Sequence, residues 1–339
     1  MKALQPIEQD EVFQTHILEL VSRTFALTIP QLPEPLDRTV SNAYLLCRIA
    51  DTIEDDPSLS FKDKQYYSKW FASLVKDYTC ADNFANELAS KLGETITNAE
   101  KELIEKCDSV LKITHSLTES ERSAMLECLE AMTTGMVKYQ GMETLEGLKN
   151  QEELDLYCYY VAGVVGVMLT KLFLEYGKEW SEKTKQGMKT LAVSFGQGLQ
   201  MTNIIKDFWV DRKRGACWLP QSVFRPLGVS LDKIDQENIE DFKKGTEQLI
   251  SVARDHLVNA LHYTTLIPKK EKGIRMFCLW AILMATLTLS KVKNSSDFIN
   301  GGTVKISRTT VSLVVLFSNL CNRSNLLLRI LFKLTNLKI

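Results

Sequence analysis

The sequence lacks several features that would assign a protein to a specialised class. Its 339 residues contain 41 Lys and Arg against 42 Asp and Glu, so the net charge of −1 argues against a general nucleic-acid binder. None of the eight cysteines belongs to a C-x-x-C pair, which excludes a zinc ribbon or an obvious disulfide framework and fits a reducing cytosol. The first ten residues lack a basic region followed by an apolar one, so we expect no secretory signal.

No uncharged stretch reaches the ~20 apolar residues that a membrane-spanning helix needs. The longest ones, residues 156–170, 190–205 and 276–290, also contain polar residues. We therefore predict that they form buried core helices.

Proline is scarce, and none of the eight prolines lies between Pro57 and Pro220. A proline-free segment rich in Leu, Ala, Lys and Glu is typical of long helices, and no alternating pattern calls for strands. Thr118 and Glu121 form a capping-box pattern that begins one of the helices. We therefore predict an all-α, single-domain fold, with helices near residues 10–27, 37–55, 61–77, 83–105, 119–139, 150–176, 181–211, 238–263 and 271–292.

The C-terminal tail differs from the rest of the chain, so we divide the chain into a catalytic domain of residues 1–297 and a tail of residues 298–339. The tail has no acidic residue and six basic ones, Lys305, Arg308, Arg323, Arg329, Lys333 and Lys338. Residues 326–334 mix bulky apolar residues with cations, which predicts an amphipathic helix on an anionic membrane surface. A final helix that packs on the body is the alternative. We expect the fold to survive deletion of residues 310–339.

Carboxylates gather at the end of the second predicted helix. Asp51, Glu54 and Asp55 are spaced i, i+3 and i+4, so they share one face. Three such groups repel one another unless a cation neutralises them, and acids at a helix C-terminus oppose the helix dipole. The cluster is either a solvated acidic helix end or a cation site.

A second polar stripe follows a long uncharged segment. Asn203, Asp207 and Asp211 are spaced i, i+4 and i+8, with Gln200 one turn earlier. Oxygen ligands without His or Cys suit Mg²⁺, which completes its shell with water and phosphate oxygens. Two acidic helices that face each other across a bundle would hold several Mg²⁺ ions and a diphosphate, and an apolar cavity beside them would hold an allylic chain. Two unrelated amphipathic faces are the alternative.

At these residues the sequence resembles the squalene/phytoene synthase family of head-to-head prenyltransferases. The two acidic segments resemble the family's D-x-x-E-D and N-x-x-x-D-x-x-x-D motifs. Residues 157–166 resemble its Y-x-x-x-V-A-G-x-V-G signature, and residues 22–25 resemble its S-R-S/T-F element. Tyr44 and Arg48 stand just ahead of the first acidic motif, as they do in the family. The resemblance spans roughly residues 15–295.

The resemblance implies an isoprenoid-synthase-type bundle around a central cavity and the condensation of two farnesyl diphosphates through a cyclopropyl intermediate. It implies that Asp51, Glu54, Asp55, Asn203, Asp207 and Asp211 bind Mg²⁺. The catalytic residues that it implies are Tyr157, Tyr44 and Arg48, and Tyr157 would take or relay the proton lost on ring closure. Substrate would contact Ser22, Arg23, Phe25, Gln200 and Asn203. Arg23, Arg48 and Lys206 would grip diphosphate oxygens, and their alternative is a structural salt bridge with the same carboxylates.

The tail indicates to which branch of the family the chain is most similar. Residues 302–308 resemble the V-K-I-R-K element of squalene synthases, where Lys305 and Arg308 would meet the phosphate of NADPH, although Ser307 replaces the first Arg. We therefore expect a squalene synthase in the isoprenoid route to sterols or hopanoids, with residues 212–220 more like bacterial relatives. A dehydrosqualene or phytoene synthase without reduction is the alternative, and a class I terpene cyclase is a weaker one. We expect a cytoplasmic monomer, peripheral to a membrane surface, with no nucleic-acid partner.

Overall fold

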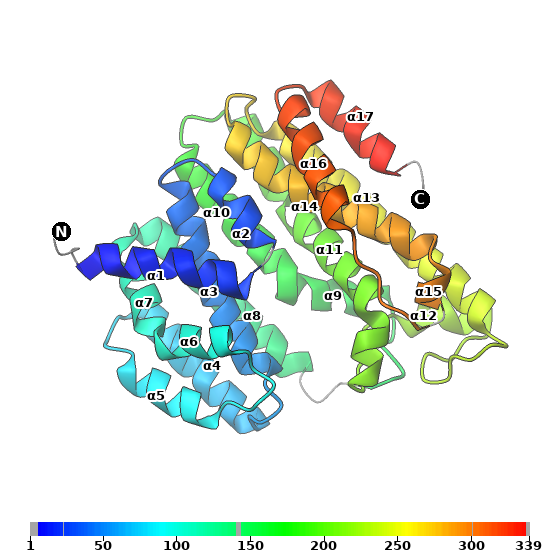
Figure 1. Ribbon diagram of the computed structural model, residues 1–339, viewed down its shortest axis with the longest axis horizontal. Coiled ribbons are helices and arrows are strands. Elements are labelled where there is room, and N and C mark those ends of the chain that lie inside the picture. Colours follow the sequence, from blue (N-terminus) through cyan, green and yellow to red (C-terminus); the bar gives the residue numbers. More distant parts are fainter. Residues whose placement is uncertain (1–5, 23, 140–143, 300, 337–339) are drawn as a thin grey trace. The chain divides into compact units, whose positions relative to one another are not determined.

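A computed structural model describes residues 6–22, 24–139, 144–299 and 301–336 (Figure 1). Helices make up the regular structure, and the described ranges contain no β-strand, which confirms the all-α prediction. The α-helices are α1 (Pro6–Val21), α2 (Phe25–Thr28), α3 (Leu36–Asp55), α4 (Phe61–Lys76), α5 (Asp82–Lys91), α6 (Asn98–Glu105), α7 (Cys107–Ser116), α8 (Glu119–Tyr139), α9 (Gln151–Cys158), α10 (Val164–Tyr176), α11 (Glu182–Lys213), α12 (Gln221–Phe224), α13 (Ile239–Leu266), α14 (Lys272–Lys293), α15 (Ser296–Ile299), α16 (Arg308–Cys321) and α17 (Asn325–Asn336). The 3₁₀ turns are η1 (Ile29–Gln31) and η3 (Arg225–Leu227), and the π-helical turn is η2 (Tyr159–Gly163).

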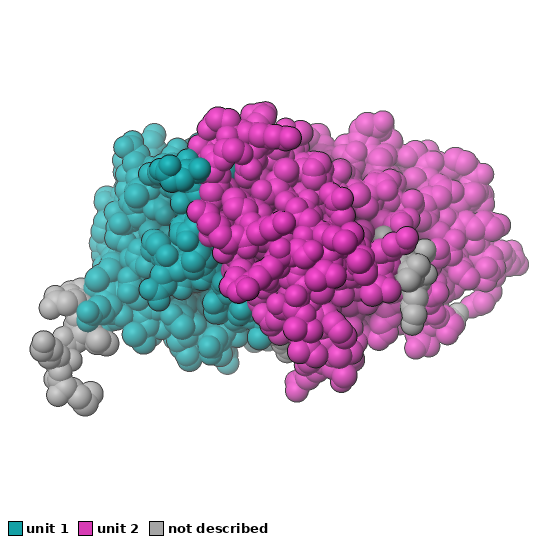
Figure 2. All heavy atoms as spheres, turned by 90° about the horizontal axis from the view of Figure 1, so that it is seen from above, with its two compact units in different colours: residues 1–138, 168–179 teal, residues 139–167, 180–339 magenta. Residues whose placement is uncertain are grey.

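The helices form two compact units. Unit 1 comprises residues 1–138 and 168–179, and unit 2 comprises residues 139–167 and 180–339 (Figure 2). The predicted division of the chain at residue 297 stays a prediction. All eight cysteines are free thiols, in keeping with the absence of a disulfide framework.

In unit 1, α3 is the central helix. Its apolar side chains Leu45, Ile49 and Ile53 are fully buried, and α3 packs against α1, α6 and α7. A second face of α3 carries the polar residues discussed below.

The predicted continuous helix over residues 83–105 is wrong, because the chain breaks between α5 and α6. The backbone N–H of Gly93 donates to Asp56 Oδ2 at 2.8 Å, and a Cβ on Gly93 would lie 2.0 Å from Ser58 Oγ. Thr97 and Glu100 then form a complete capping box that begins α6. By contrast, the predicted helix over residues 119–139 is confirmed as α8, with the Thr118–Glu121 capping bonds in place.

In unit 2, the long helix α11 packs against α13 and α14. Helix α14 buries 15 of its 22 residues, which confirms that residues 276–290 form a core helix. Two helical stretches, Gln151–Tyr176 and Lys272–Lys293, have the length and apolar composition that a membrane crossing requires. The second has 78% of its most apolar window buried inside the protein, as the core helix of a water-soluble unit also has, so this is weak evidence for a span.

The tail helices α16 and α17 pack on α14, and α17 also touches α13. Beneath them Arg275 of α14 is fully buried, and its guanidinium donates to Asn322 O at 2.7 Å and to Asn325 Oδ1 at 2.6 Å. Leu328 and Phe332 of α17 are buried as well. The tail therefore completes the core of unit 2, which argues against the expectation that residues 310–339 can be deleted without harm to the fold.

Candidate active site

One face of α3 brings together most of the residues predicted for the N-terminal half of the site. Tyr44, Arg48, Asp51 and Asp55 follow one another at helical spacing along this face. The Tyr44 hydroxyl donates to Val21 O at 3.3 Å, and its ring centroid lies 5.0 Å from that of Phe25.

The turn that precedes α2 places the S-R-T-F element beside this face. Ser22 is buried, and its Oγ accepts a hydrogen bond from the backbone N–H of Phe25 at 3.0 Å. Burial raises the pKa of Tyr44, while a hydrogen bond with Ser22 and the charge of Arg48 oppose that rise. The Tyr44 hydroxyl is therefore protonated at neutral pH. Arg23, also predicted here, lies outside the described residues.

Asp51 is the most perturbed carboxyl on this face. Burial raises its pKa first, and the carboxylate of Asp55 raises it further, so that the pKa reaches about 7 although Arg48 opposes the shift. A buried carboxyl group that has a second carboxylate beside it has this signature. It is the electrostatic deficit that a bound cation would remove.

The Arg48 guanidinium is already engaged. It forms an ion pair with Glu100, which is largely buried and also completes the α6 capping box with Thr97. Burial alone would raise the pKa of Glu100, but its hydrogen bonds with Thr97 and the pair with Arg48 hold it below the usual value. Arg48 Nε is buried without a hydrogen-bond partner in the described part of the chain, so the guanidinium keeps one unused donor.

Glu100 was not predicted as part of this region. The Thr-x-x-Glu pattern at residues 97–100 could have identified it as a capping residue, but nothing local in the sequence links it to Arg48. At the end of α3, Lys64 Nζ donates to the backbone carbonyl of Glu54. This cation neutralises the partial negative charge of the helix C-terminus, which the three acids otherwise increase. Glu54 is half-buried and Asp55 is exposed.

In unit 2, α11 carries the second predicted stripe. Asn203 is exposed, whereas Asp207 and Asp211 are partly buried. Each carboxylate has a cationic neighbour: Lys206 Nζ lies 2.8 Å from Asp207 Oδ2, and Arg214 pairs with Asp211. Burial raises the pKa of Asp211, Arg214 lowers it, and Asp207 raises it again.

Lys206 therefore forms a salt bridge with a carboxylate of the stripe, Asp207. Such a salt bridge was the alternative that we gave to a direct contact between Lys206 and a diphosphate. Gln200, half-buried one turn before Asn203, lies on the same helix. The roles of all these residues in binding stay predictions.

Tyr157 lies on α9 between two aromatic rings. It stacks on Trp218, with centroids 4.2 Å apart and planes 7° apart, and it meets Tyr139 edge to face at 5.1 Å. The two contacts fix the orientation of the phenol ring, which is half-buried. Nothing local in the sequence links Tyr157 to Trp218, because 61 positions separate the two residues.

The glycine signature that follows Tyr157 is explained by close helix packing. A Cβ on Gly166 would lie 2.3 Å from Ala192 O, and a Cβ on Gly196 would lie 2.1 Å from Ala162 O. The π-helical turn η2 lies at this approach, and such turns are frequent at functional sites. Glycine is thus required for the contact of η2 and α10 with α11.

The carboxylates on α3 and α11 are hard oxygen donors, the kind of ligand that Mg²⁺ takes. Within either unit, the described residues hold no group of three or more His, Cys, Asp or Glu side chains arranged around a common metal position. Each helix instead offers a pair of carboxylates, Asp51 with Asp55 and Asp207 with Asp211. Mg²⁺ commonly takes one or two carboxylates and fills the rest of its octahedral shell with water and phosphate oxygens.

The predicted cofactor cations lie at the start of α16. Lys305 and Arg308 are exposed, and Ser307 caps the helix by accepting a hydrogen bond from Thr310 N at 3.1 Å. Two cations beside a helix N-terminus suit a phosphate group. The preceding glycines form a hydrogen-bonded end to α15, with Gly302 N donating to Asp297 O at 2.7 Å. The pattern of two glycines therefore marks a helix cap here.

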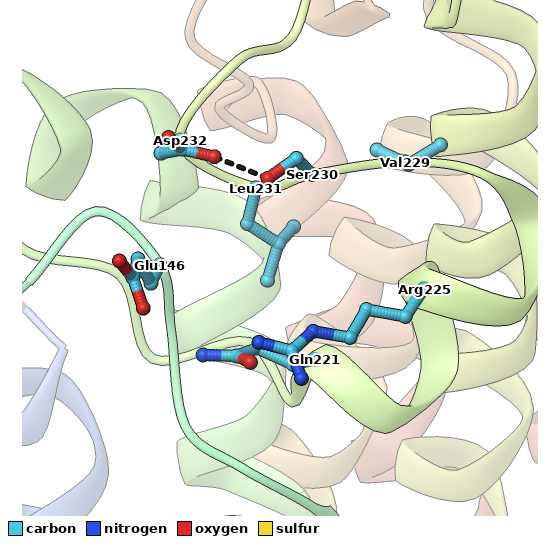
Figure 3. A pocket seen from close by; sticks show the side chains of 7 residues that line it. All are labelled: Glu146, Gln221, Arg225, Val229, Ser230, Leu231 and Asp232. Atoms are coloured by element: carbon cyan, nitrogen blue, oxygen red, sulfur yellow. Dashed lines mark hydrogen bonds between the residues drawn. The ribbon is translucent and has the colours of Figure 1, made fainter.

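A small cavity of about 160 Å³ lies elsewhere in unit 2 (Figure 3). Gln221 and Arg225 extend toward one side of it, and Ser230 and Asp232 hydrogen-bond to each other on the other side. None of the predicted site residues lines it. Its mixed charges and small volume do not suit a prenyl chain.

Known proteins resemble the chain along most of its length. The family model of squalene/phytoene synthases matches residues 18–310. A squalene synthase of Cyberlindnera jadinii is 31% identical over 307 residues, which are 88% of this chain and 65% of that protein. The solved structure of TcSQS with the ligand E5700 is 25% identical, has a TM-score of 0.83, and is matched over 98% of this chain and 91% of the other. A dehydrosqualene synthase structure is 18% identical with a TM-score of 0.64, matched over 92% and 96% of the two chains, and shares the fold.

These matches show how much of its relatives the chain covers and to which family it belongs. The chain spans just under two thirds of the length of the first curated relatives it matches. Those relatives are eukaryotic, whereas residues 212–220 had indicated bacterial ones. The family match covers the acidic stripes, the tyrosine–glycine signature and the S-R-T-F element alike. The chain belongs to the squalene/phytoene synthase family.

Proposed function

We propose that the chain is a squalene synthase, which joins two farnesyl diphosphates head to head into a cyclopropyl diphosphate and then reduces it to squalene with NADPH. The observation that carries the proposal is the carboxylate-rich face of α3, where burial and the neighbouring carboxylate of Asp55 raise the pKa of Asp51 to about 7. The names of the curated relatives and the position of Lys305 and Arg308 at a helix N-terminus support the reductive branch.

On α3, we assign Asp51, Glu54 and Asp55 to Mg²⁺ and Arg48 to the diphosphate. Bound Mg²⁺ supplies Lewis-acid stabilisation of the charge that develops on the leaving diphosphate. Arg48 keeps its position through the pair with Glu100 and offers its unpaired Nε–H as a donor. Tyr44, protonated because burial raises its pKa, offers a neutral hydroxyl, and Ser22 and Phe25 hold the turn beside it.

On α11, we assign Asn203, Asp207 and Asp211 to Mg²⁺, with Gln200 and Asn203 also contacting substrate. Lys206 would exchange its contact with Asp207 for a diphosphate oxygen once Mg²⁺ neutralises the carboxylate. Arg23 would act as a second diphosphate cation.

Tyr157 is our candidate for the group that takes or relays the proton lost when the cyclopropane ring closes. Its hydroxyl is a competent proton relay only if the ring is held in one orientation, and Trp218 and Tyr139 supply that restraint. The apolar residues of the uncharged helices would exclude water, which would otherwise quench the carbocation.

Incubation with farnesyl diphosphate and Mg²⁺, with and without NADPH, tests the proposal. A cyclopropyl diphosphate without NADPH and squalene with it are the expected products. One C30 hydrocarbon regardless of NADPH would indicate a dehydrosqualene synthase. A cyclised C15 product would indicate a terpene cyclase.

We also propose that the chain acts in the cytoplasm as a monomer peripheral to a membrane. The free cysteines fit a reducing compartment. Both the substrate and the product that we propose are amphiphilic or apolar, so a location at a lipid surface would favour their exchange.

A further inference from the structure

The small cavity of Figure 3 has a lining that is mostly polar and carries charges of both signs. Its volume of about 160 Å³ equals the space that about five water molecules occupy, so it admits only a small molecule. The polar residues that line it are Glu146, Gln221, Arg225, Ser230 and Asp232. All of them belong to unit 2, so the cavity is complete within one unit.

Two residues of opposite charge face this cavity without pairing. Figure 3 shows Glu146 reaching it from one side and Arg225 from the other. Within the part of the chain that the structure describes, neither side chain forms an ion pair, although many exposed cations elsewhere have a carboxylate partner. Both side chains are exposed, so a dissolved molecule can reach them. The cavity therefore offers one free positive and one free negative charge to the same small volume.

Backbone contacts hold the wall that carries Glu146. Gln221 N donates to Leu148 O at 2.7 Å, and Gln221 Nε2 donates to Gly147 O at 3.1 Å. Gly147 has a φ of +83°, and a Cβ on it would lie 2.3 Å from Leu219 O. Glycine is therefore required beside Glu146, and the segment that carries this acid is fixed against the segment that begins α12.

The opposite wall is fixed by the end of α11. Arg212 donates to the carbonyl of Leu231 and, at 2.7 Å, to the carbonyl of Asp232. The hydroxyl of Ser230 donates to the carboxylate of Asp232, which orients this second acid at the edge of the cavity. Both walls are thus held by hydrogen bonds to backbone atoms, and a cavity that is formed before its ligand arrives is typical of small-molecule sites.

A ligand that carries both charges suits this lining better than a simple ion or water. An anion alone would be repelled by Glu146 and Asp232, and a cation alone would be repelled by Arg225. Water can bridge the groups but supplies no charge to pair with them. A carboxylate accepts two parallel hydrogen bonds from a guanidinium, and an ammonium donates to carboxylates. A molecule with both groups would satisfy the two sides of the cavity at once.

We propose that this cavity is a binding site for a small zwitterion of the α-amino-acid class. The carboxylate of the ligand contacts Arg225, and its ammonium contacts Glu146, with the negative charge of Asp232 close by. The volume leaves room for a side chain of a few atoms beside Val229 and Leu231, which line the same cavity. The inference goes beyond the function proposed above and does not depend on it, because none of the residues assigned to catalysis lines the cavity.

Isothermal titration calorimetry of the 339-residue chain tests the proposal, without farnesyl diphosphate or Mg²⁺ in the cell. The probe is L-alanine. Propionate, which lacks the ammonium, and ethylamine, which lacks the carboxylate, are the matched ligands. Arg225→Gln and Glu146→Gln each remove one of the two charges. Arg254→Gln is the control variant, because Arg254 is exposed on α13 and does not line the cavity.

L-Alanine should bind the wild type and the control with a Kd on the order of 1 mM, as a small ligand at an open site does. Propionate and ethylamine should each bind at least about tenfold more weakly. Arg225→Gln and Glu146→Gln should each weaken the binding of L-alanine about tenfold, because each loses one charge-assisted contact at a solvent-exposed position. All variants should keep the wild-type melting temperature, because the changed side chains are exposed.

The absence of saturable binding of L-alanine up to about 10 mM would overturn the proposal and leave the cavity to water. Propionate or ethylamine that binds as tightly as L-alanine would overturn it as well, because one of the two charges would then contribute nothing. The same holds for L-alanine that binds either variant as it binds the control. The titration contains no substrate, so its result is separate from the outcome of the assays for squalene synthesis.

Discussion

The contact between Asn325 and the buried Arg275 offers a direct measure of how far the tail stabilises unit 2. Arg275 is fully buried and has no carboxylate partner in the described residues. Its guanidinium donates to four acceptors: Thr264 O, Ile267 O, Asn322 O and Asn325 Oδ1. Burial lowers the pKa of Arg275, so the acceptors are what keep the charge tolerable. Two of the four belong to the tail.

Asn325→Ala should lower the stability of unit 2 by about 2–4 kcal/mol. It removes a hydrogen bond to a charged group at 2.6 Å, worth ~1.5–3 kcal/mol, and the 3.1 Å bond from Asn325 Nδ2 to Thr265 O, worth ~0.5–1.5 kcal/mol. For a unit of this size that is a fall in melting temperature of about 4–16 °C. Deletion of residues 310–339 would also remove the buried side chains of Leu328 and Phe332, each worth ~1.5–3 kcal/mol of burial, and should leave unit 2 close to unfolding.

Thermal unfolding followed by circular dichroism makes the comparison. Asn319→Ala is the matched control, because Asn319 is exposed on α16 and donates only to Val315 O within its own helix. It should shift the melting temperature by no more than about 2 °C. Equal melting temperatures for the two variants, or a tail deletion that melts as the full chain does, would refute the assignment of the tail to the core of unit 2.

Four further predictions concern the site. Asp207→Asn should leave the fold intact and reduce kcat by a factor of about a thousand or more in steady-state assays, because a metal ligand is lost; wild-type turnover would remove Asp207 from the metal site. Tyr157→Phe should slow formation of the cyclopropyl diphosphate roughly 100-fold in single-turnover experiments while substrate affinity survives, and normal rates would reduce Tyr157 to a packing residue. Lys305→Ala should accumulate the cyclopropyl diphosphate at NADPH concentrations that saturate the wild type, because a charge-assisted contact with phosphate is worth about 10–150-fold in affinity; unchanged squalene yield would contradict that contact. Burial raises the pKa of Asp51 in the folded protein to about 7. The stability that its protonated carboxyl contributes is therefore fully present below pH ~4 and is lost as the pH rises through 7. At pH 8 the buried charge leaves a cost of ~1–3 kcal/mol. Asp51→Asn should therefore raise the melting temperature at pH 8 without Mg²⁺ and not at pH 4, and Mg²⁺ should stabilise the wild type more than the variant; a variant that melts as the wild type at both values would refute the shift.

Local signals predicted the helices well where a cap or a proline lies at the boundary. The Thr118–Glu121 pair placed the start of α8 correctly, and the helix predicted to end at residue 55, shortly before Pro57, ends there as α3. The break between α5 and α6 was missed because its cause, the contact of Gly93 with Asp56, joins residues 37 positions apart. Hydrophobic periodicity contains no information about such a contact.

The same limit applies to the site. The spacing of the carboxylates on α3 and α11 followed from helix geometry alone, because residues at i and i+4 share a face. The partners of Arg48 and Tyr157 did not follow from helix geometry. Arg48 pairs with Glu100, which comes from a different helix, and Tyr157 stacks on Trp218 from the segment after α11. The burial of Arg275 could not be predicted either. An isolated arginine in an apolar helix is expected at the surface until its hydrogen-bond acceptors in the tail are known.

Product analysis by mass spectrometry tests the central claim most directly. The purified 339-residue chain is incubated with farnesyl diphosphate and Mg²⁺, first without NADPH and then with it, and an EDTA-treated sample serves as the control. We expect a cyclopropyl C30 diphosphate in the first reaction, squalene in the second and neither with EDTA. Squalene that forms without NADPH, a C30 hydrocarbon that is the same in both reactions, or only C15 products would contradict it.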